Sequence, residues 1–145
     1  MIIWRISNYA DLTGQGGIRF SARWHSKGHP VLYCAESPAG ALNETLVHFE
    51  KATMPDSYQL LKISVPDELE VAKAKLPKKH WQSDVAITRE IGDHWLKQNH
   101  TALLRVPSVI TPETFNVLVN PSHQDVRKIK ITKIYKVPFD GRLKD

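Results

Sequence analysis

The chain has 145 residues, 41% hydrophobic and 24% charged, a composition typical of one globular domain and unlike that of a disordered chain. Its formal net charge of +5 favours an anionic ligand or an acidic partner, so nucleic acid has to be considered. The single cysteine excludes an internal disulfide and favours a reducing compartment, which we take to be the cytoplasm. No apolar run approaches the roughly 20 residues of a membrane helix, and no secretory signal pattern opens the chain, so we expect no membrane partner.

The first third of the chain predicts strands followed by a helix. Residues 1–6 form a short apolar run that indicates a first strand. Residues 18–24 and 31–35 are rich in strand-forming side chains, and the Gly and Pro between them indicate a reversal, so we expect two adjacent antiparallel strands. Ser37 is a suitable N-cap, and Pro38 suits the first helical position because its missing N–H would have no partner there.

The middle of the chain predicts a strand, a surface segment and a longer helix. Residues 59–65 alternate well enough for a strand, whereas residues 71–79 carry too many lysines for the core and indicate a surface excursion. From Ser83, a second N-cap candidate, apolar residues recur at helical spacing up to about Asn99. The exposed face of this helix should carry Arg89, Asp93 and Lys97.

Three further strands are expected towards the C-terminal end. Residues 102–106 and 115–119 have the composition of buried strands. Residues 128–137 alternate and then slip phase between Lys133 and Ile134, which indicates a β-bulge. The lysines of this segment suit an edge strand, because charge discourages pairing with other chains. We find no repeat or domain boundary, so residues 1–145 are expected to form one mixed α and β domain.

Several common chemistries fit this sequence poorly. The Gly14-Gln15-Gly16 loop lacks the third glycine and the Lys-Ser/Thr of phosphate-binding loops. The seven histidines include no HExxH-type pair, so we expect no metal. No serine has the flanking glycines of a hydrolase nucleophile, and Cys34 lies in an apolar strand, where thiols are usually inert.

Arg23, Tyr33 and Glu44 remain as candidates, because the predicted elements present them one after another. Each also has an ordinary structural explanation, as a surface ion-pair partner, a core aromatic and a solvated helix residue respectively. The pattern alone does not decide between these explanations and a site.

A family resemblance extends over nearly the whole chain. It is carried by Arg-Phe-Ser-Ala-Arg-Trp at 19–24, Gly-His-Pro-Val-Leu-Tyr at 28–33, Ala-Leu-Asn-Glu at 41–44, Arg-Val-Pro-Ser-Val-Ile at 105–110 and Asn-Val-Leu-Val-Asn-Pro-Ser-His at 116–123. In this order these segments resemble the RES-domain family, named for Arg, Glu and Ser. His25 is one departure, since the family more often has Asn there, and Ser21-Ala22 replaces the more usual Gly pair.

The resemblance implies an α+β fold similar to ADP-ribosyltransferases, with largely antiparallel sheets and flanking helices. It further implies the toxin of a bacterial type II toxin–antitoxin system, with NAD as its substrate and no tightly bound cofactor. The implied partner is a helix-turn-helix, Xre-like antitoxin, which alone would contact DNA, and a homodimer is left open. The toxin would cleave the nicotinamide–ribose bond, and water, phosphate or a protein side chain would accept the ADP-ribose.

The family's functional residues fall on Arg23, Tyr33, Glu44 and Ser108, with Asn120 as a further NAD-binding residue. Glu44 would stabilise the cationic anomeric carbon, and the planar fork of Arg23 would bind the pyrophosphate. Tyr33 would stack on nicotinamide, while Ser108 would hydrogen-bond either a ribose hydroxyl or the amide.

A second hypothesis is a basic nucleic-acid-binding module built on the lysine-rich terminal strand, although that strand lacks interleaved stacking aromatics beyond Tyr135. A purely structural interaction protein is the third.

Overall fold

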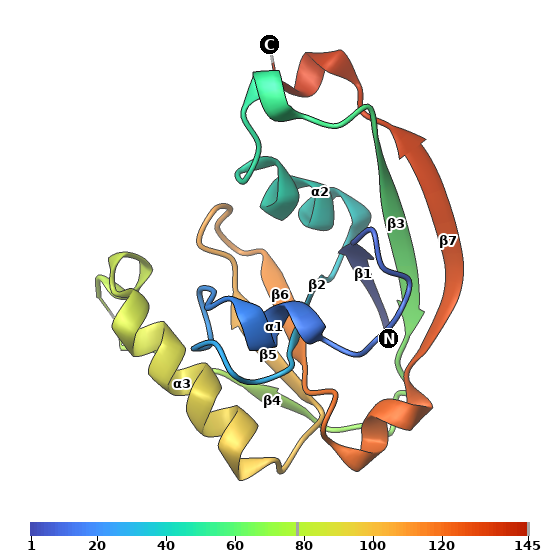
Figure 1. Cartoon of the computed structure of the whole chain (residues 1–145). Coiled ribbons are helices and arrows are strands. Elements are labelled where there is room, and N and C mark those ends of the chain that lie inside the picture. Colours follow the sequence, from blue (N-terminus) through green and yellow to red (C-terminus); the bar gives the residue numbers. More distant parts are fainter. Residues whose placement is uncertain (78, 145) are drawn as a thin grey trace.

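A seven-stranded sheet organises the fold (Figure 1). The structure is a computed structural model, and it describes residues 1–77 and 79–144. The strands are β1 Ile2–Ile6, β2 Leu32–Ala35, β3 Ser57–Ser64, β4 Val71–Lys73, β5 Leu103–Pro107, β6 Phe115–Val119 and β7 Lys130–Pro138. Their order across the sheet is β4-β5-β6-β2-β1-β3-β7. Among the strands of the described residues, β4 and β5 pair in parallel and the other neighbouring pairs are antiparallel.

Three α-helices among the described residues accompany this sheet. They are α1 Gln15–Arg19, α2 Pro38–Leu46 and α3 Val85–Gln98. In Figure 1, α3 lies along the left side near β4 and β5, and the long β3–β7 ribbon forms the right side. Short 3-10 helices occupy Lys51–Thr53, Trp81–Ser83, Gln124–Lys128 and Gly141–Lys144. The predicted α+β class with a largely antiparallel sheet is confirmed. None of the helices formed by the described residues is long and apolar enough to cross a membrane.

The core follows from the two-residue period of the central strands, whose side chains alternate between the two faces of the sheet. On one face, Leu103 of β5 packs with Val117 and Val119 of β6. On the other face, Leu104 and Leu118 pack with side chains from α3, which covers this part of the sheet. Because both faces are largely buried, these strands are apolar at most positions and do not alternate strictly, although β5 contains Arg105 and β6 contains Asn116.

The prediction of a strand over residues 18–24 was wrong. Residues up to Arg19 belong to α1, and the remainder forms a turn with one isolated bridge between Ala22 and His25. Both edges of β2 are occupied, by β1 and β6, so no edge remains for a strand from this segment. The backbone instead folds closely over the chain before β2, and a Cβ on Gly17 would lie 2.5 Å from the His29 carbonyl oxygen.

Two other predictions need correction at their boundaries. The surface excursion at residues 71–79 begins with β4, an edge strand parallel to β5, and residue 78 lies outside the described residues. The N-cap of α3 is Asp84 and not Ser83, because the Asp84 carboxylate accepts the Ile87 N–H at 3.2 Å.

The C-terminal strand is close to its prediction. β7 is the outermost strand beside β3, so the predicted edge position is confirmed. Lys62 of β3 pairs with Lys133 while Ile63 pairs with Ile131, which leaves Thr132 as the extra residue. The bulge therefore exists, one residue before the expected position.

Candidate active site

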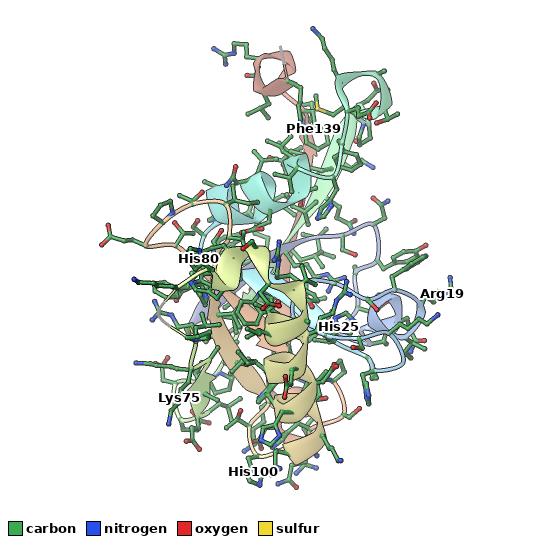
Figure 2. All side chains as sticks on the ribbon, turned by 90° about the vertical axis from the view of Figure 1, so that its left-hand side faces the viewer. Arg19, His25, Lys75, His80, His100 and Phe139 are labelled. Carbon is green, nitrogen blue, oxygen red and sulfur yellow. The ribbon has the colours of Figure 1, made fainter. Side chains whose placement is uncertain are left out.

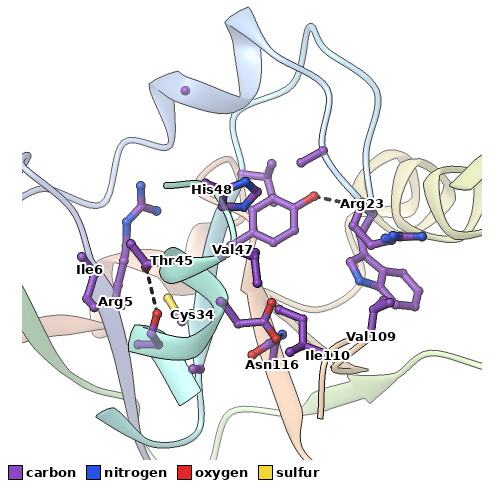
Figure 3. A pocket seen from close by; sticks show the side chains of 18 of the residues that line it. Arg5, Ile6, Arg23, Cys34, Thr45, Val47, His48, Val109, Ile110 and Asn116 are labelled. Carbon is purple, nitrogen blue, oxygen red and sulfur yellow. Dashed lines mark hydrogen bonds between the residues drawn. The ribbon is translucent and has the colours of Figure 1, made fainter. Parts of the chain in front are cut away.

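A cavity of about 670 Å³ opens beside β2 and α2. Its wall includes Arg23, Tyr33 and Glu44, so the structure brings together the three residues that the sequence presented in succession. Residues from β1, α1 and the segment between β5 and β6 complete the wall, and Figure 3 shows several of them. The volume lies within the usual range of small-molecule sites.

Glu44 reaches the cavity because α2 begins at Pro38, as the sequence predicted. The Ser37 hydroxyl accepts the Gly40 N–H at 2.9 Å, and Pro38 occupies the first turn. Both features satisfy or remove backbone donors that a helix start leaves without partners. Glu44 follows in the next turn, and its side chain faces β5 and β6.

Two neutral donors hold the same oxygen of the Glu44 carboxylate. The Ser108 hydroxyl donates to Glu44 Oε1 at 2.6 Å, and Asn116 Nδ2 donates to the same atom at 2.9 Å. Oε2 receives no hydrogen bond from the described residues, so this side of the carboxylate is available to a ligand. Asn116, which sequence reasoning missed, lies at the start of β6 in the segment that carried the family resemblance.

The Ser108 hydroxyl has no hydrogen-bonding capacity left for a ligand in this arrangement. It donates to Glu44 and accepts the backbone N–H groups of Ile110 and Thr111 at 3.1 and 3.2 Å. A serine hydroxyl offers one donor and two acceptor positions, and all are used. The contribution of Ser108 to the site is therefore its hydrogen bond to the Glu44 carboxylate.

Arg23 lies in the turn after α1, and α3 holds that turn in place. Arg23 Nη1 donates to the Gln82 carbonyl oxygen at 2.9 Å. The Thr88 hydroxyl donates to the Arg23 carbonyl oxygen, and Arg89 Nε donates to the carbonyl oxygen of Ala22 at 2.8 Å. These contacts fix the backbone on which the Arg23 guanidinium is mounted.

The next turn of α3 continues the contact. Gly92 packs against Trp24 so closely that a Cβ would lie 1.5 Å from the Trp24 carbonyl oxygen. The Asp93 carboxylate accepts the backbone N–H and the hydroxyl of Ser26 at 2.8 and 2.7 Å. Arg89 and Asp93 were predicted to face solvent, but they bind this turn. The sequence could not show the difference, because charged residues that bind a neighbouring loop have the same helical spacing as solvated ones.

Tyr33 comes from β2, and its hydroxyl is buried. The hydroxyl oxygen accepts the Trp24 backbone N–H at 3.2 Å and lies 2.7 Å from His25 Nδ1. His25 Nε2 lies 3.1 Å from the Gly17 carbonyl oxygen. Burial raises the pKa of the Tyr33 hydroxyl well above its ordinary value, because the ionised form would lose its hydration. The hydroxyl therefore keeps its proton across the physiological range.

Comparison with known proteins identifies the family of this chain. The RES domain family matches residues 2–140. The chain belongs to the RES-domain family.

Three relatives are similar along almost their whole length. "Toxin Res" of Pseudomonas putida is 44% identical over 133 residues, covering 90% of this chain and 92% of the relative. "Prs ADP-ribosylating toxin" of Sphingobium sp. is 38% identical, covering 97% and 94%. "Toxin Res" of Yersinia enterocolitica is 32% identical, covering 91% and 90%.

The cavity of this RES domain also contains a second arginine. Arg5, on β1, lines the cavity, and Figure 3 shows Arg5 and Arg23 on opposite sides of it. Arg5 Nε and Asn116 Oδ1 are the buried side-chain nitrogen and oxygen atoms that lack a hydrogen-bond partner among the described residues. Both belong to cavity residues, which is typical of a site that is completed by a polar ligand. A charged residue inside the apolar run of β1 was the sequence signal for Arg5.

Asn120 lies apart from this cavity in the RES domain. It follows β6 at the far end from Asn116, and its side chain is buried. Its amide donates to Asn99 Oδ1 at 2.9 Å and its oxygen accepts the Ser122 N–H at 3.0 Å. Asn120 thus joins the end of α3 to the turn after β6, and the structure does not bring it to Glu44.

The described part of the RES domain contains no group of three His, Cys, Asp or Glu side chains arranged to hold a metal ion. Cys34 lines the cavity but is buried, and burial raises the pKa of its thiol to about 12. A thiol that stays protonated is a poor nucleophile. The charged and polar side chains in the wall of the cavity include Glu44, Tyr33, Arg5, Arg23 and His48.

Proposed function

We propose that this RES domain is the toxin of a bacterial type II toxin–antitoxin system and that it consumes NAD by cleaving the nicotinamide–ribose bond. The observation that carries the proposal is the Glu44 carboxylate, held at Oε1 by Ser108 and Asn116 with Oε2 free in a cavity that also presents Arg23 and Tyr33. The name of the Sphingobium relative, an ADP-ribosylating toxin, supports NAD as the substrate.

Bond cleavage needs negative charge next to the ribose. As the bond breaks, its electron pair leaves with the nicotinamide nitrogen, and the anomeric carbon becomes an oxocarbenium-like cation. Glu44 Oε2 would face this carbon, while Ser108 and Asn116 keep the carboxylate from turning away. Such fixed charge stabilises a transition state without reorganisation during the reaction. Ser108 thus acts as a positioning residue and contacts neither the ribose nor the amide.

Two cations would bind the pyrophosphate of NAD. Arg23 uses Nη1 for the Gln82 carbonyl oxygen, which leaves its other N–H donors for phosphate oxygens. Arg5 adds a second guanidinium from the opposite side of the cavity. Tyr33 offers a ring in the wall on which nicotinamide would stack.

The acceptor of the ADP-ribose determines the class of product. Water gives ADP-ribose, phosphate gives a phosphorylated ADP-ribose, and a protein side chain gives a modified protein. Mass spectrometry of the products after incubation with NAD, with and without phosphate and cell extract, separates the three.

A helix-turn-helix antitoxin would silence the toxin by covering the cavity. Exposed apolar side chains lie on the cavity rim, with Phe20 at 72%, Val47 at 55% and Ile110 at 38% exposure. Exposed apolar side chains gathered in one place are typical of protein interaction surfaces. The cationic interior suits a carboxylate-bearing segment of that partner. DNA would then be contacted through the antitoxin.

Expression in bacteria tests the proposal. We expect production of the toxin in the cytoplasm to lower cellular NAD before growth stops, and production of its antitoxin to restore both. Growth arrest with unchanged NAD would refute NAD consumption and favour the nucleic-acid-binding hypothesis.

A further inference from the structure

His25 is buried, at 1% exposure, and both of its ring nitrogens lie within hydrogen-bond distance of a partner. Figure 2 shows it between α3 and α1, whereas Arg19 extends outwards. A buried imidazole of this kind either supports packing alone or orients a neighbouring group. The identity of its partners distinguishes the two roles.

The hydrogen bonds define the tautomer of His25. The Gly17 carbonyl oxygen, 3.1 Å from Nε2, can only accept, so the proton lies on Nε2. In the neutral ring, Nδ1 then carries a lone pair and accepts the hydroxyl proton of Tyr33 at 2.7 Å. The Tyr33 oxygen in turn accepts the Trp24 N–H. Every donor in this chain of hydrogen bonds meets an acceptor.

The chain of bonds gives the Tyr33 ring one position. Without His25, the hydroxyl would keep only the 3.2 Å contact from Trp24 and would lose the acceptor of its proton. The ring lines the same cavity as Glu44, so its tilt sets where a flat ligand can lie relative to that carboxylate. His25 also links α1 to β2, because Gly17 belongs to α1.

We propose that His25 is a positioning residue, which fixes the Tyr33 ring through the hydroxyl so that nicotinamide stacks with its ribose bond at Glu44. The inference rests on the proposed NAD chemistry. It assigns no contact between His25 and the substrate, and it predicts that His25 and the Tyr33 hydroxyl act as one unit.

Steady-state kinetics with NAD test this unit through His25→Leu, Tyr33→Phe and the double variant. We expect each single variant to lower kcat by about 10- to 100-fold with a smaller change in KM, because misplacement of a bound group mainly affects the reacting geometry. The double variant should be no slower than the slower single variant, since both changes remove the same hydrogen bond. If the fold-decreases in kcat of the two single variants multiply in the double variant, the proposal is overturned. A parental kcat in His25→Leu would overturn it as well.

Two further variants separate positioning from folding. Asn places an amide oxygen near the position of Nδ1, so His25→Asn should recover most of kcat even though it cannot reach Gly17. Failure of His25→Asn to exceed His25→Leu would count against the proposal. His29→Leu is the matched control, because His29 is exposed four residues later and should keep parental kinetics.

Nitrogen NMR of the parent protein tests the inference without any turnover. We expect His25 to carry its proton on Nε2, and Tyr33→Phe to shift the resonance of His25 Nδ1. A parent that does not cleave NAD would overturn the proposed function, and the spectra would then decide the His25 assignment alone. A proton on Nδ1, or an Nδ1 resonance that Tyr33→Phe leaves unchanged, would overturn it.

Discussion

Gly92→Ala tests whether α3 positions the Arg23 turn. The new methyl group would lie 1.5 Å from the Trp24 carbonyl oxygen, whereas ordinary van der Waals contacts of a Cβ begin at 3.4 Å. Helix and turn would therefore have to separate by roughly 2 Å. Overpacking of this kind typically costs about 1–3 kcal/mol or more, and it exceeds the ~1 kcal/mol by which Ala favours a helix over Gly.

Because the approach is so close, the overpacking cost should lie near the upper end of that range, at about 3 kcal/mol. After the ~1 kcal/mol gain from Ala, we expect a net loss of about 2 kcal/mol and a fall in Tm of roughly 4–8 °C, measured by urea and thermal unfolding. The same displacement should raise the KM for NAD, because Arg23 moves with the turn. Gly16→Ala is the stability control, since a Cβ at Gly16 in α1 meets no atom within 4 Å. A Gly92→Ala protein as stable as the parent, with unchanged KM, would show that α3 does not hold the Arg23 turn in place.

Three other predictions address the thiol, the partner and the carboxylate. Burial raises the pKa of Cys34 to about 12, while an unfolded thiol ionises near ~8.5, so ionisation favours the unfolded state in between. Between about pH 8.5 and pH 12, the free energy of unfolding should therefore fall by up to about 1.4 kcal/mol per pH unit. Urea titrations of Cys34→Ala should lack this contribution. Arg23→Glu should weaken antitoxin binding strongly, whereas Lys130→Glu with Lys133→Glu should change mainly its salt dependence; calorimetry giving equal affinities for parent and Arg23→Glu would rule out direct contact. Asn116→Ala should lower kcat about 10-fold, because one donor to Glu44 is lost, and an unchanged kcat would show that Ser108 alone suffices.

Local signals in the sequence predicted most of the elements. Ser37 with Pro38 marked the start of α2 correctly, because capping depends on residues within one turn. The strands β5 and β6 were also predicted from local sequence. A short, mostly apolar segment indicates a buried strand whichever strands lie beside it. The lysines and the phase slip of β7 indicated its edge position and its bulge.

The errors came from long-range contacts. Residues 18–24 have strand-forming side chains, but β1 and β6 occupy the two edges of β2, and β6 lies far along the chain. Arg89 and Asp93 looked like a solvated helix face because their partners, in the Arg23 turn, lie more than sixty residues away. Asn116 was missed for the same reason, since its bond to Glu44 spans 72 positions.

The site residues required the family resemblance. Arg23, Tyr33 and Glu44 each have ordinary structural explanations, and only their shared cavity distinguishes them from such residues. Asn120, which the resemblance indicated as an NAD-binding residue, lies outside the wall of this cavity, and its role stays a prediction.

Nicotinamide release from NAD by purified protein tests whether this RES domain consumes NAD through Glu44. The parent protein should release nicotinamide, and Glu44→Gln, which keeps the shape of the side chain and removes its charge, should be slower by on the order of 100-fold or more. Both proteins should show the same unfolding midpoint within experimental error, so that folding does not account for the difference. Release at the parental rate by folded Glu44→Gln would contradict the role of Glu44, and no release by the parent would contradict NAD consumption.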